Sequence, residues 1–291
     1  MTMLRALIKT MRPRQWTKNA FLFAALVFDG KLFRRADFLH TLAGFALFCL
    51  VSSAVYIFND LMDIEADRQH PVKRYRPIAA GIVPIPLALT YGLALTILAF
   101  ILAWPLGWPF TLTLFLYLIL MLAYSRFLKH IPILDVLIIA AGFVLRVHAG
   151  VTLIVVERFS PWLYVIMTLL ALYLGFGKRR AELALLADEA NRHRKVLDGY
   201  TIPLLDQYIT IVSATTIVAY SLYTFFRPEV PGNHALMLTI PFVVYGIFRY
   251  LYLIQVEHAG GAPEDILLSD RPLQVAIFLW TLSVLAIFYF L

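Results

Sequence analysis

Long apolar segments alternate with shorter polar segments along the whole chain, and this pattern predicts its secondary structure. Most of the apolar segments approach the ~20 residues that a helix needs to cross a bilayer. They lack the alternation of apolar and polar residues that marks the strands of a membrane barrel. We therefore predict an all-α fold, a polytopic membrane bundle of about nine transmembrane helices, or about eight if the short first segment does not span. The predicted spans are residues 15–28, 38–58, 83–104, 108–124, 131–156, 160–176, 202–226, 235–254 and 272–290.

The composition agrees with a membrane protein that forms one domain. Of the 291 residues, 61% are hydrophobic and 15% are charged, and the mean hydropathy is +0.79, whereas a soluble domain is nearer half apolar. No linker or low-complexity tract divides the sequence, so residues 1–291 are predicted to form a single transmembrane domain. The one cysteine, Cys49, lies in an apolar segment, which excludes a disulfide framework and a cysteine-based metal site.

The Lys and Arg residues predict the orientation of the protein in the membrane. With a cytoplasmic N-terminus, the cytoplasmic connections contain eighteen of the 25 Lys and Arg residues and the outer connections five. This is the asymmetry that cytoplasmic loops show, and it predicts a multi-pass protein of the cell membrane whose N-terminus and active site are cytoplasmic. The basic residues behind the net charge of +7 are concentrated at one membrane face, without a nucleic-acid-binding motif. The expected partners are therefore anionic lipids and phosphorylated substrates, and no nucleic acid.

A dense acidic segment, residues 59–67, carries the first candidate chemistry. Carboxylates that crowd one face of a helix repel one another unless a cation neutralises them, and hard oxygen ligands suit Mg²⁺. Four side chains with oxygen ligands share one face of a helix that advances about 100° per residue: Asn59, Asp60, Asp63 and Asp67. This spacing predicts a magnesium site.

A basic segment follows the acidic one at once, with Lys73, Arg74 and Arg76. Carboxylate-bound magnesium with Lys and Arg side chains beside it forms a receptor for a diphosphate. The alternative is a charged helix end in contact with solvent, which is what a run of charges usually is. The helical spacing of the acids and their place at the end of an apolar segment favour the metal site.

Two further groups of cations are candidates for phosphate binding. Lys178, Arg179 and Arg180 end an apolar segment, where such a group either binds phosphate or only anchors the topology. Arg146 lies about fifteen residues into an apolar segment, where a lone cation is costly and normally faces a cavity or a partner. Asp135 stands eleven residues earlier, about 16 Å along the same helix. The two side chains cannot pair directly at that distance, but both can line one cavity.

The loop before the last predicted span leaves two interpretations open. Gly260, Gly261 and Pro263 prevent a continuous helix across it. In the first interpretation, Asp270 caps the N-terminus of the last helix and the segment is structural. In the second, the loop is a lid and Arg271 contacts a substrate phosphate.

These motifs resemble the UbiA superfamily of intramembrane prenyltransferases. Its first signature, Asn-Asp-x-x-Asp-x-x-x-Asp, is matched by residues 59–67, and its tyrosine-to-lysine element has a near counterpart from Tyr124 to Lys129. The resemblance implies about nine helical spans around a central cavity, closed by cytoplasmic caps, with Mg²⁺ bound by acidic motifs. A second signature, Asp-x-x-x-Asp, is missing, and three cations stand roughly in its place. Glu182 is the nearest acid, Asp188 lies about two turns further on, and a role of either in metal binding stays open.

That departure resembles one branch of the superfamily, the decaprenyl-phosphate phosphoribosyltransferases. Four other stretches resemble the same branch: residues 12–19, 70–77, 134–146 and 263–271. The branch implies transfer of 5-phosphoribosyl from phosphoribosyl diphosphate to a polyprenyl phosphate, with release of diphosphate. A donor with two phosphate-bearing positions and an anionic acceptor need more fixed cations than a simple prenyl donor does, which agrees with the replacement of the second acidic motif.

The resemblance also implies roles for individual residues. Asp60, Asp63 and Asp67 would be catalytic and, with Asn59, would bind Mg²⁺. The implied substrate-binding residues are Lys18, Asn19, Lys73, Arg74, Arg76, Tyr124, Lys129, Arg146, Lys178, Arg179, Arg180 and Arg271.

Two other functions compete with this prediction. A conventional UbiA-type prenyltransferase, which moves a polyprenyl chain onto an aromatic acceptor, uses the same first acidic motif, but the missing second motif argues against it. A transporter or lipid flippase would place its polar groups near the membrane midplane, whereas the ionisable groups here concentrate at one face. The chain length of the lipid and assembly into a homo-oligomer stay open.

Overall fold

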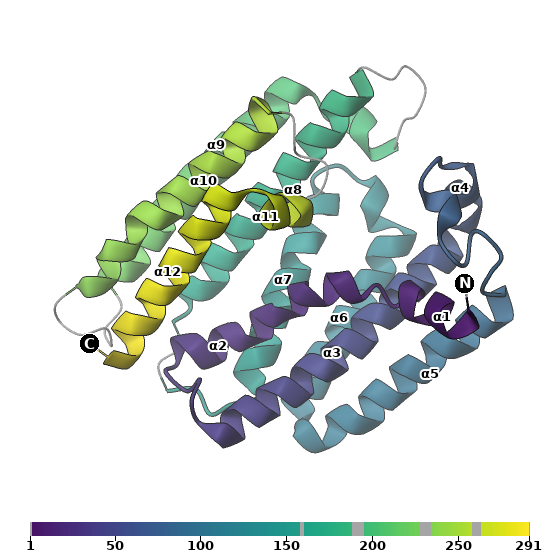
Figure 1. Ribbon diagram of the computed structural model, residues 1–291, viewed down its shortest axis with the longest axis horizontal. Helices are drawn as coiled ribbons and strands as arrows, with labels where there is room; N and C mark the ends of the chain where they lie inside the picture. Colours follow the sequence, from purple (N-terminus) through teal and green to yellow (C-terminus); the bar gives the residue numbers. More distant parts are fainter. Residues whose placement is uncertain (1, 158–159, 188–194, 227–233, 258–262, 291) are drawn as a thin grey trace. The chain divides into compact units, whose positions relative to one another are not determined.

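The structure is a computed structural model that describes residues 2–157, 160–187, 195–226, 234–257 and 263–290. Every regular element within these ranges is a helix, and none of these residues lies in a β-strand. The predicted all-α fold is therefore confirmed. Figure 1 shows the helices and their connections in chain order.

Seven helices among the described residues are long and apolar enough to cross a membrane. Each coincides with a predicted span, some with a short 3₁₀ turn at one end. They are α3 (Arg35–Met62), α5 (Ile85–Ala103), α6 (Trp108–Arg126), α7 (Leu134–Thr152), α9 (Ile202–Phe226), α10 (Ile240–Gln255) and α12 (Arg271–Phe290).

The other two predicted spans differ from regular apolar helices, so the count of nine is approximate. Residues 160–176 lie mostly in α8 (Trp162–Ala187), a helix that continues into the charged residues at 178–182. Residues 15–28 form a 3₁₀ helix, η1 (Pro13–Leu22), followed by the short α2 (Phe23–Phe28). Pro at the start of η1 is tolerated because its missing N–H would have no helical partner there.

The chain divides into two compact units, each described separately. Unit 1 comprises Met1–Lys129 and Leu145–Glu157, and unit 2 comprises His130–Val144 and Arg158–Leu291. The boundary falls within α7, so that one helix contributes to both units. The single transmembrane domain over residues 1–291 stays a prediction.

Unit 1 is built around α3, which packs against α5, α6 and η1. Figure 1 shows α3 beside α5. The buried face of α3 supplies Phe48, Val51 and Val55 to an apolar core, and burial of such side chains contributes roughly 1.5–3 kcal/mol each. Gly150 allows α7 to approach η1, because a Cβ atom at this position would lie 2.0 Å from the carbonyl oxygen of Leu22. The unit also contains α1 (Met3–Thr10), α2, α4 (Ile64–Gln69) and the 3₁₀ helices η2 (Lys73–Tyr75) and η3 (Trp104–Leu106).

Unit 2 pairs α8 with α9 and α10 with α12, and α9, α10 and α12 run side by side in Figure 1. Its apolar core includes Tyr173, Tyr250 and Val196. Val196 belongs to η5 (Lys195–Gly199), a 3₁₀ helix that leads into α9. A Cβ atom on Gly199 would lie 2.2 Å from the ring of Pro132, so glycine permits close packing of η5 on the start of α7. The other elements are η6 (Ala235–Thr239) and α11 (Pro263–Ser269).

Candidate functional site

The acidic segment occupies the end of α3 and most of α4, with an interruption at Asp63. The helical spacing is kept across the interruption, because the N–H of Asp63 donates to the carbonyl of Asn59 at 3.0 Å and that of Asp67 donates to Asp63 at 2.8 Å. Asp60 and Asp67 are buried. Both contact Arg76, whose Nη1 lies 3.1 Å from Oδ1 of Asp60 and 2.6 Å from Oδ2 of Asp67. Arg76 of the basic segment therefore lies against two acids of the acidic segment.

Arg12 also contacts the acidic segment, and sequence reasoning did not single it out as a site residue. Its Nη2 donates to Oδ1 of Asp60, and its guanidinium lies 4.8 Å from the ring centre of Tyr56, a cation–π distance. Arg12 is in the left-handed region, at φ 53°, where the chain turns from α1 into η1. The only signal in the sequence was its place in the basic stretch of residues 12–19.

Lys129 pairs with the third carboxylate of the acidic segment. Its Nζ lies 2.6 Å from Oδ1 and 2.7 Å from Oδ2 of Asp63. Tyr124 is half-buried near the end of α6. Lys73 and Arg74 are exposed, and Arg74 donates to the hydroxyl of its neighbour Tyr75 at 2.7 Å. Of the predicted residues of the basic segment, Arg76 therefore bonds to two of the carboxylates.

The chemistry of the acidic segment fits a hard divalent cation, because its carboxylates are oxygen donors and two of them are buried. The arrangement does not gather them around one point: among the described residues no three His, Cys, Asp or Glu side chains are grouped closely enough to hold a metal ion. Each of the three carboxylates is bonded to a basic side chain instead. A metal ion that used the same oxygens would have to replace these cations.

Arg146 is buried within α7 and makes polar contacts in unit 1. Its Nε donates to Oδ1 of Asn19 at 2.8 Å, and its Nη2 donates to the hydroxyl of Tyr117 at 2.7 Å. Asn19 in turn donates to Ser52 at 3.1 Å. The structure therefore brings together two predicted substrate-binding residues, Arg146 and Asn19, while the neighbouring Lys18 is half-buried. Partners of this kind meet the requirement that a cation inside a membrane helix be solvated by protein groups.

The cations at the end of α8 are bonded to acids within unit 2. Arg179 is buried, with its Nε 2.6 Å from Oδ2 of Asp135 and its Nη1 2.6 Å from Oε2 of Glu182. Arg180 lies 2.6 Å from Asp206 through its Nε. Asp135, expected to line a cavity with Arg146, therefore has Arg179 as its charged partner.

Tyr200 and Asp206 complete this group, and sequence reasoning missed both. The hydroxyl of Tyr200 donates to Oδ1 of Asp135 at 2.7 Å and accepts the N–H of Ile133, which has a φ of 70°. Burial and the bond to Asp135 raise the pKa of Tyr200. A β-branched residue in the left-handed region is uncommon, so Tyr200 stabilises an unusual turn at the start of α7. Asp206 was visible in the sequence only as an acid near the start of a predicted span.

The start of α12 confirms the interpretation of Asp270 as a helix cap. Its Oδ1 accepts the N–H of Leu273 at 2.8 Å, and its Oδ2 lies 2.7 Å from Nη2 of Arg249. The Arg249 guanidinium holds the pKa of the Asp270 carboxyl below its usual range. The next residue, Arg271, is exposed.

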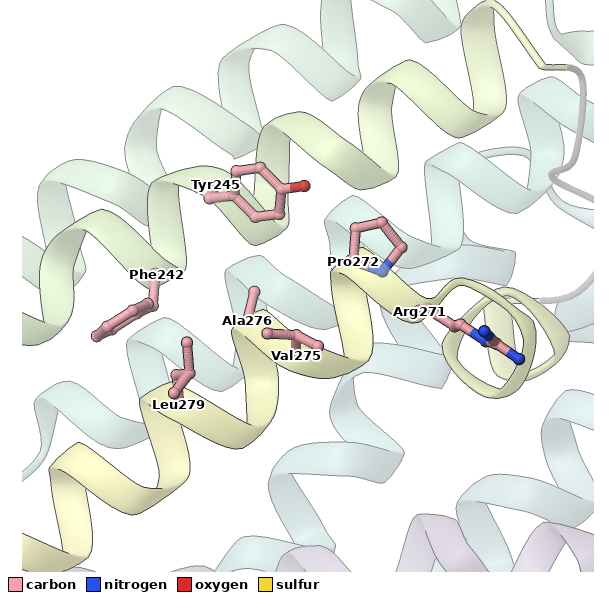
Figure 2. A pocket seen from close by; sticks show the side chains of 7 residues that line it. All are labelled: Phe242, Tyr245, Arg271, Pro272, Val275, Ala276 and Leu279. Atoms are coloured by element: carbon pink, nitrogen blue, oxygen red, sulfur yellow. The ribbon is translucent and has the colours of Figure 1, made fainter.

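Arg271 lies at one end of a shallow groove between α10 and α12. The groove is otherwise lined by apolar and aromatic side chains: Phe242, Tyr245, Pro272, Val275, Ala276 and Leu279. Figure 2 shows the guanidinium of Arg271 extending away from Tyr245. Its contact with a substrate phosphate therefore stays a prediction. Asp188 and residues 260–262 of the predicted lid lie outside the described residues.

Comparison with known proteins identifies relatives over nearly the whole chain. A family model described as the UbiA prenyltransferase family matches residues 20–260. The chain is 36% identical over 285 residues to a decaprenyl-phosphate phosphoribosyltransferase of Mycobacterium tuberculosis strain H37Rv, covering 95% of this chain and 92% of that protein. It is 32% identical over 290 residues to the protein of the same name from Corynebacterium glutamicum, covering 97% and 86%.

Solved structures share the fold. A UbiA homolog from Archaeoglobus fulgidus, bound to GPP and Mg²⁺, superposes with a TM-score of 0.74 at 19% identity, covering 97% of this chain and 99% of that one. A structure concerned with digeranylgeranylglyceryl phosphate synthase gives a TM-score of 0.71 at 16% identity and covers all of both chains. At this level of identity the likeness concerns the arrangement of helices.

Proposed function

Because the chain belongs to the UbiA prenyltransferase family, we propose that it transfers 5-phosphoribosyl from phosphoribosyl diphosphate to a polyprenyl phosphate and releases diphosphate. The observation that carries this proposal is the likeness, over almost the whole chain, to decaprenyl-phosphate phosphoribosyltransferases. The cations at 178–180, where the superfamily's second acidic motif is missing, support the same branch. The protein is a transferase with several membrane-spanning helices, and its active site is proposed to be cytoplasmic.

The acidic segment is the proposed binding site for the diphosphate of the donor. Asp60, Asp63 and Asp67, assisted by Asn59, would hold Mg²⁺, as their oxygen donors suit this ion. A structural relative is bound to GPP and Mg²⁺, which supports a divalent ion in this fold. Bound there, magnesium supplies positive charge against the departing diphosphate. Arg76 lies against the same carboxylates and would contact the diphosphate directly.

The proposed reaction needs positioning more than proton transfer. The bond between C1 of the ribose and the diphosphate oxygen breaks, and its electron pair leaves with the diphosphate. A phosphate oxygen of the acceptor forms the new bond to C1, which has oxocarbenium character in the transition state. The acceptor oxygen is already anionic, so no general base is required. Cationic side chains that hold both phosphates in place would therefore account for most of the rate.

The remaining phosphates are proposed to bind to the other cations. Arg146 and Asn19 form a polar group inside the apolar part of unit 1, which suits an anionic group on a lipid. The other proposed contacts are Lys18, Lys73, Arg74, Tyr124, Lys129, Lys178, Arg179, Arg180 and Arg271. Arg179 and Arg180 are bonded to acids. To bind a phosphate, each arginine would have to contact its acid and the phosphate together, or leave the acid.

Two parallel incubations test the proposal. Membranes that contain the protein are given phosphoribosyl diphosphate with polyprenyl phosphate, or polyprenyl diphosphate with 4-hydroxybenzoate, each with Mg²⁺. We expect a lipid product only in the first incubation. A product only in the second would overturn the proposal in favour of a conventional prenyltransferase.

A further inference from the structure

The acidic segment is electrically neutralised by the chain itself. Three carboxylates contact three cations: Asp60 with Arg12 and Arg76, Asp67 with Arg76, and Asp63 with Lys129. A cluster without net charge has little general attraction for a divalent cation. A metal ion that binds to these carboxylates must therefore compete with the three basic side chains.

The arginines occupy one oxygen of each of the two buried carboxylates. Oδ1 of Asp60 accepts from both Arg12 and Arg76, and Oδ2 of Asp67 accepts from Arg76 at 2.6 Å. Magnesium binds carboxylate oxygens at about 2.1 Å. An ion at that distance would lie against the guanidinium nitrogens, so like-charge repulsion would drive the arginines away from these oxygens.

The two arginines are more exposed than the carboxylate that they contact. The side chains of Arg12 and Arg76 are each 26% exposed, whereas that of Asp60 is 3% exposed. The two arginines therefore lie on the solvent side of the carboxylate. A ligand that arrives from solvent meets the cations first, and an arginine released from Asp60 can turn toward that ligand without crossing the protein interior.

We propose that Arg12, with Arg76, is a resident counter-cation of the acidic segment, which therefore binds a divalent ion together with a diphosphate and only weakly without it. This inference rests on the proposed function for the identity of the anion. Once a divalent ion holds the carboxylates, the released cations leave an excess of positive charge that a diphosphate neutralises. Each ligand therefore raises the affinity of the other, by the same factor.

A counter-cation of Asp60 and a residue that only binds phosphate have different effects on metal binding. Removing a phosphate contact would weaken diphosphate binding and leave binding of the metal alone unchanged. Removing Arg12 takes one of the two guanidinium groups from Oδ1 of Asp60 and leaves the cluster with one more net negative charge, so it should strengthen binding of the metal alone. A titration with the metal alone therefore distinguishes the two roles, because its affinity rises only if Arg12 is a counter-cation.

The test is a titration of the purified full-length protein with Mn²⁺, followed by the electron paramagnetic resonance signal of the free ion, with and without inorganic diphosphate; the Mn²⁺ that diphosphate binds by itself is measured in protein-free samples and subtracted. We expect diphosphate to raise the Mn²⁺ affinity of the natural protein at least about tenfold. Arg12→Gln should raise the affinity for Mn²⁺ alone by roughly tenfold and reduce the effect of diphosphate. Arg12→Lys, which keeps the charge, should behave like the natural protein.

Arg14→Gln is the matched control, because Arg14 is an exposed arginine of the same segment and has no acidic partner among the described residues. It should change neither titration, and thermal unfolding of every variant checks that it is folded. An unchanged or lower Mn²⁺ affinity in folded Arg12→Gln would overturn the inference, whatever the protein transfers. Conversely, coupled Mn²⁺ and diphosphate binding in a protein without phosphoribosyl transfer would remove the proposed function and leave the inference standing.

Discussion

Two charged clusters of this protein use the same residue types in different ways. In unit 1 the arginines are partly exposed and cover buried carboxylates. In unit 2 both members of the central pair are enclosed, since Arg179 is 2% exposed and Asp135 is 0% exposed. An ion pair that solvent can reach exchanges partners at low cost, whereas an enclosed pair cannot lose a member without leaving a buried charge. We therefore regard the first cluster as the one that exchanges ligands and the second as a fixed support.

The largest expected effect is on the fixed cluster. Asp135→Ala removes a buried partner of both Arg179 and Tyr200 and leaves Arg179 with Glu182, which is more exposed, so the free energy of unfolding should fall by about 3 kcal/mol. Thermal unfolding in detergent measures the loss, and adding Mn²⁺ with diphosphate should not restore it. Asp265→Ala, at an exposed position of α11, is the control and should be close to neutral. If Mn²⁺ with diphosphate restored the thermal stability of Asp135→Ala, the second cluster would exchange ligands as the first does, and the comparison would be wrong.

A smaller effect is expected on the exchanging cluster. Arg76→Met removes a guanidinium that two buried carboxylates share, and we expect the metal-free protein to lose about 2 kcal/mol. Mn²⁺ can take over those oxygens, so thermal stability should return when the ion is added. Arg14→Met serves as the control because it removes a cation that contacts no acid among the described residues. If Mn²⁺ did not raise the thermal stability of Arg76→Met, the carboxylates would not bind a metal ion.

The sequence predicted those features that depend on neighbouring residues along the chain. Apolar length alone located seven helices, because a bilayer-spanning helix needs little beyond that length. The bond between Arg76 and Asp67 is local in the same sense, since only nine residues separate them; the sequence indicated the basic segment as a neighbour of the acids but did not single out Arg76 within it. The resemblance named Lys129, which lies 66 residues from Asp63.

The sequence missed what depends on packing between distant helices. Arg12 and Asp60 are 48 residues apart, and Asp135 and Arg179 are 44 apart, so no local period joins them. Residues 15–28 were predicted to span on their apolar content. Their actual 3₁₀ conformation accompanies a buried Asn19 bonded to Ser52 and Arg146, a tertiary constraint that hydropathy does not contain.

The smallest expected effect concerns the cap of α12. Arg249 lowers the pKa of Asp270, so the stabilisation is fully present above the unfolded pKa of about 4 and is lost as the pH falls through the lower folded value. Asp270→Ala should cost about 1 kcal/mol at neutral pH and make unfolding less sensitive to acid. Unfolding between pH 7 and pH 3 measures both, with Asp265→Ala as the control. An unchanged acid sensitivity in Asp270→Ala would show that other groups govern it.

Mass analysis of the lipid product tests the central claim most directly. The purified protein is incubated with Mg²⁺, isotope-labelled phosphoribosyl diphosphate and decaprenyl phosphate, and Asp63→Ala, which removes the partner of Lys129, serves as the inactive blank. We predict a decaprenyl phosphate that has gained one labelled phosphoribosyl group, and no such lipid with Asp63→Ala. Folded natural protein that yields no labelled lipid, or a folded Asp63→Ala variant that yields as much as the natural protein, would contradict phosphoribosyl transfer at the acidic segment.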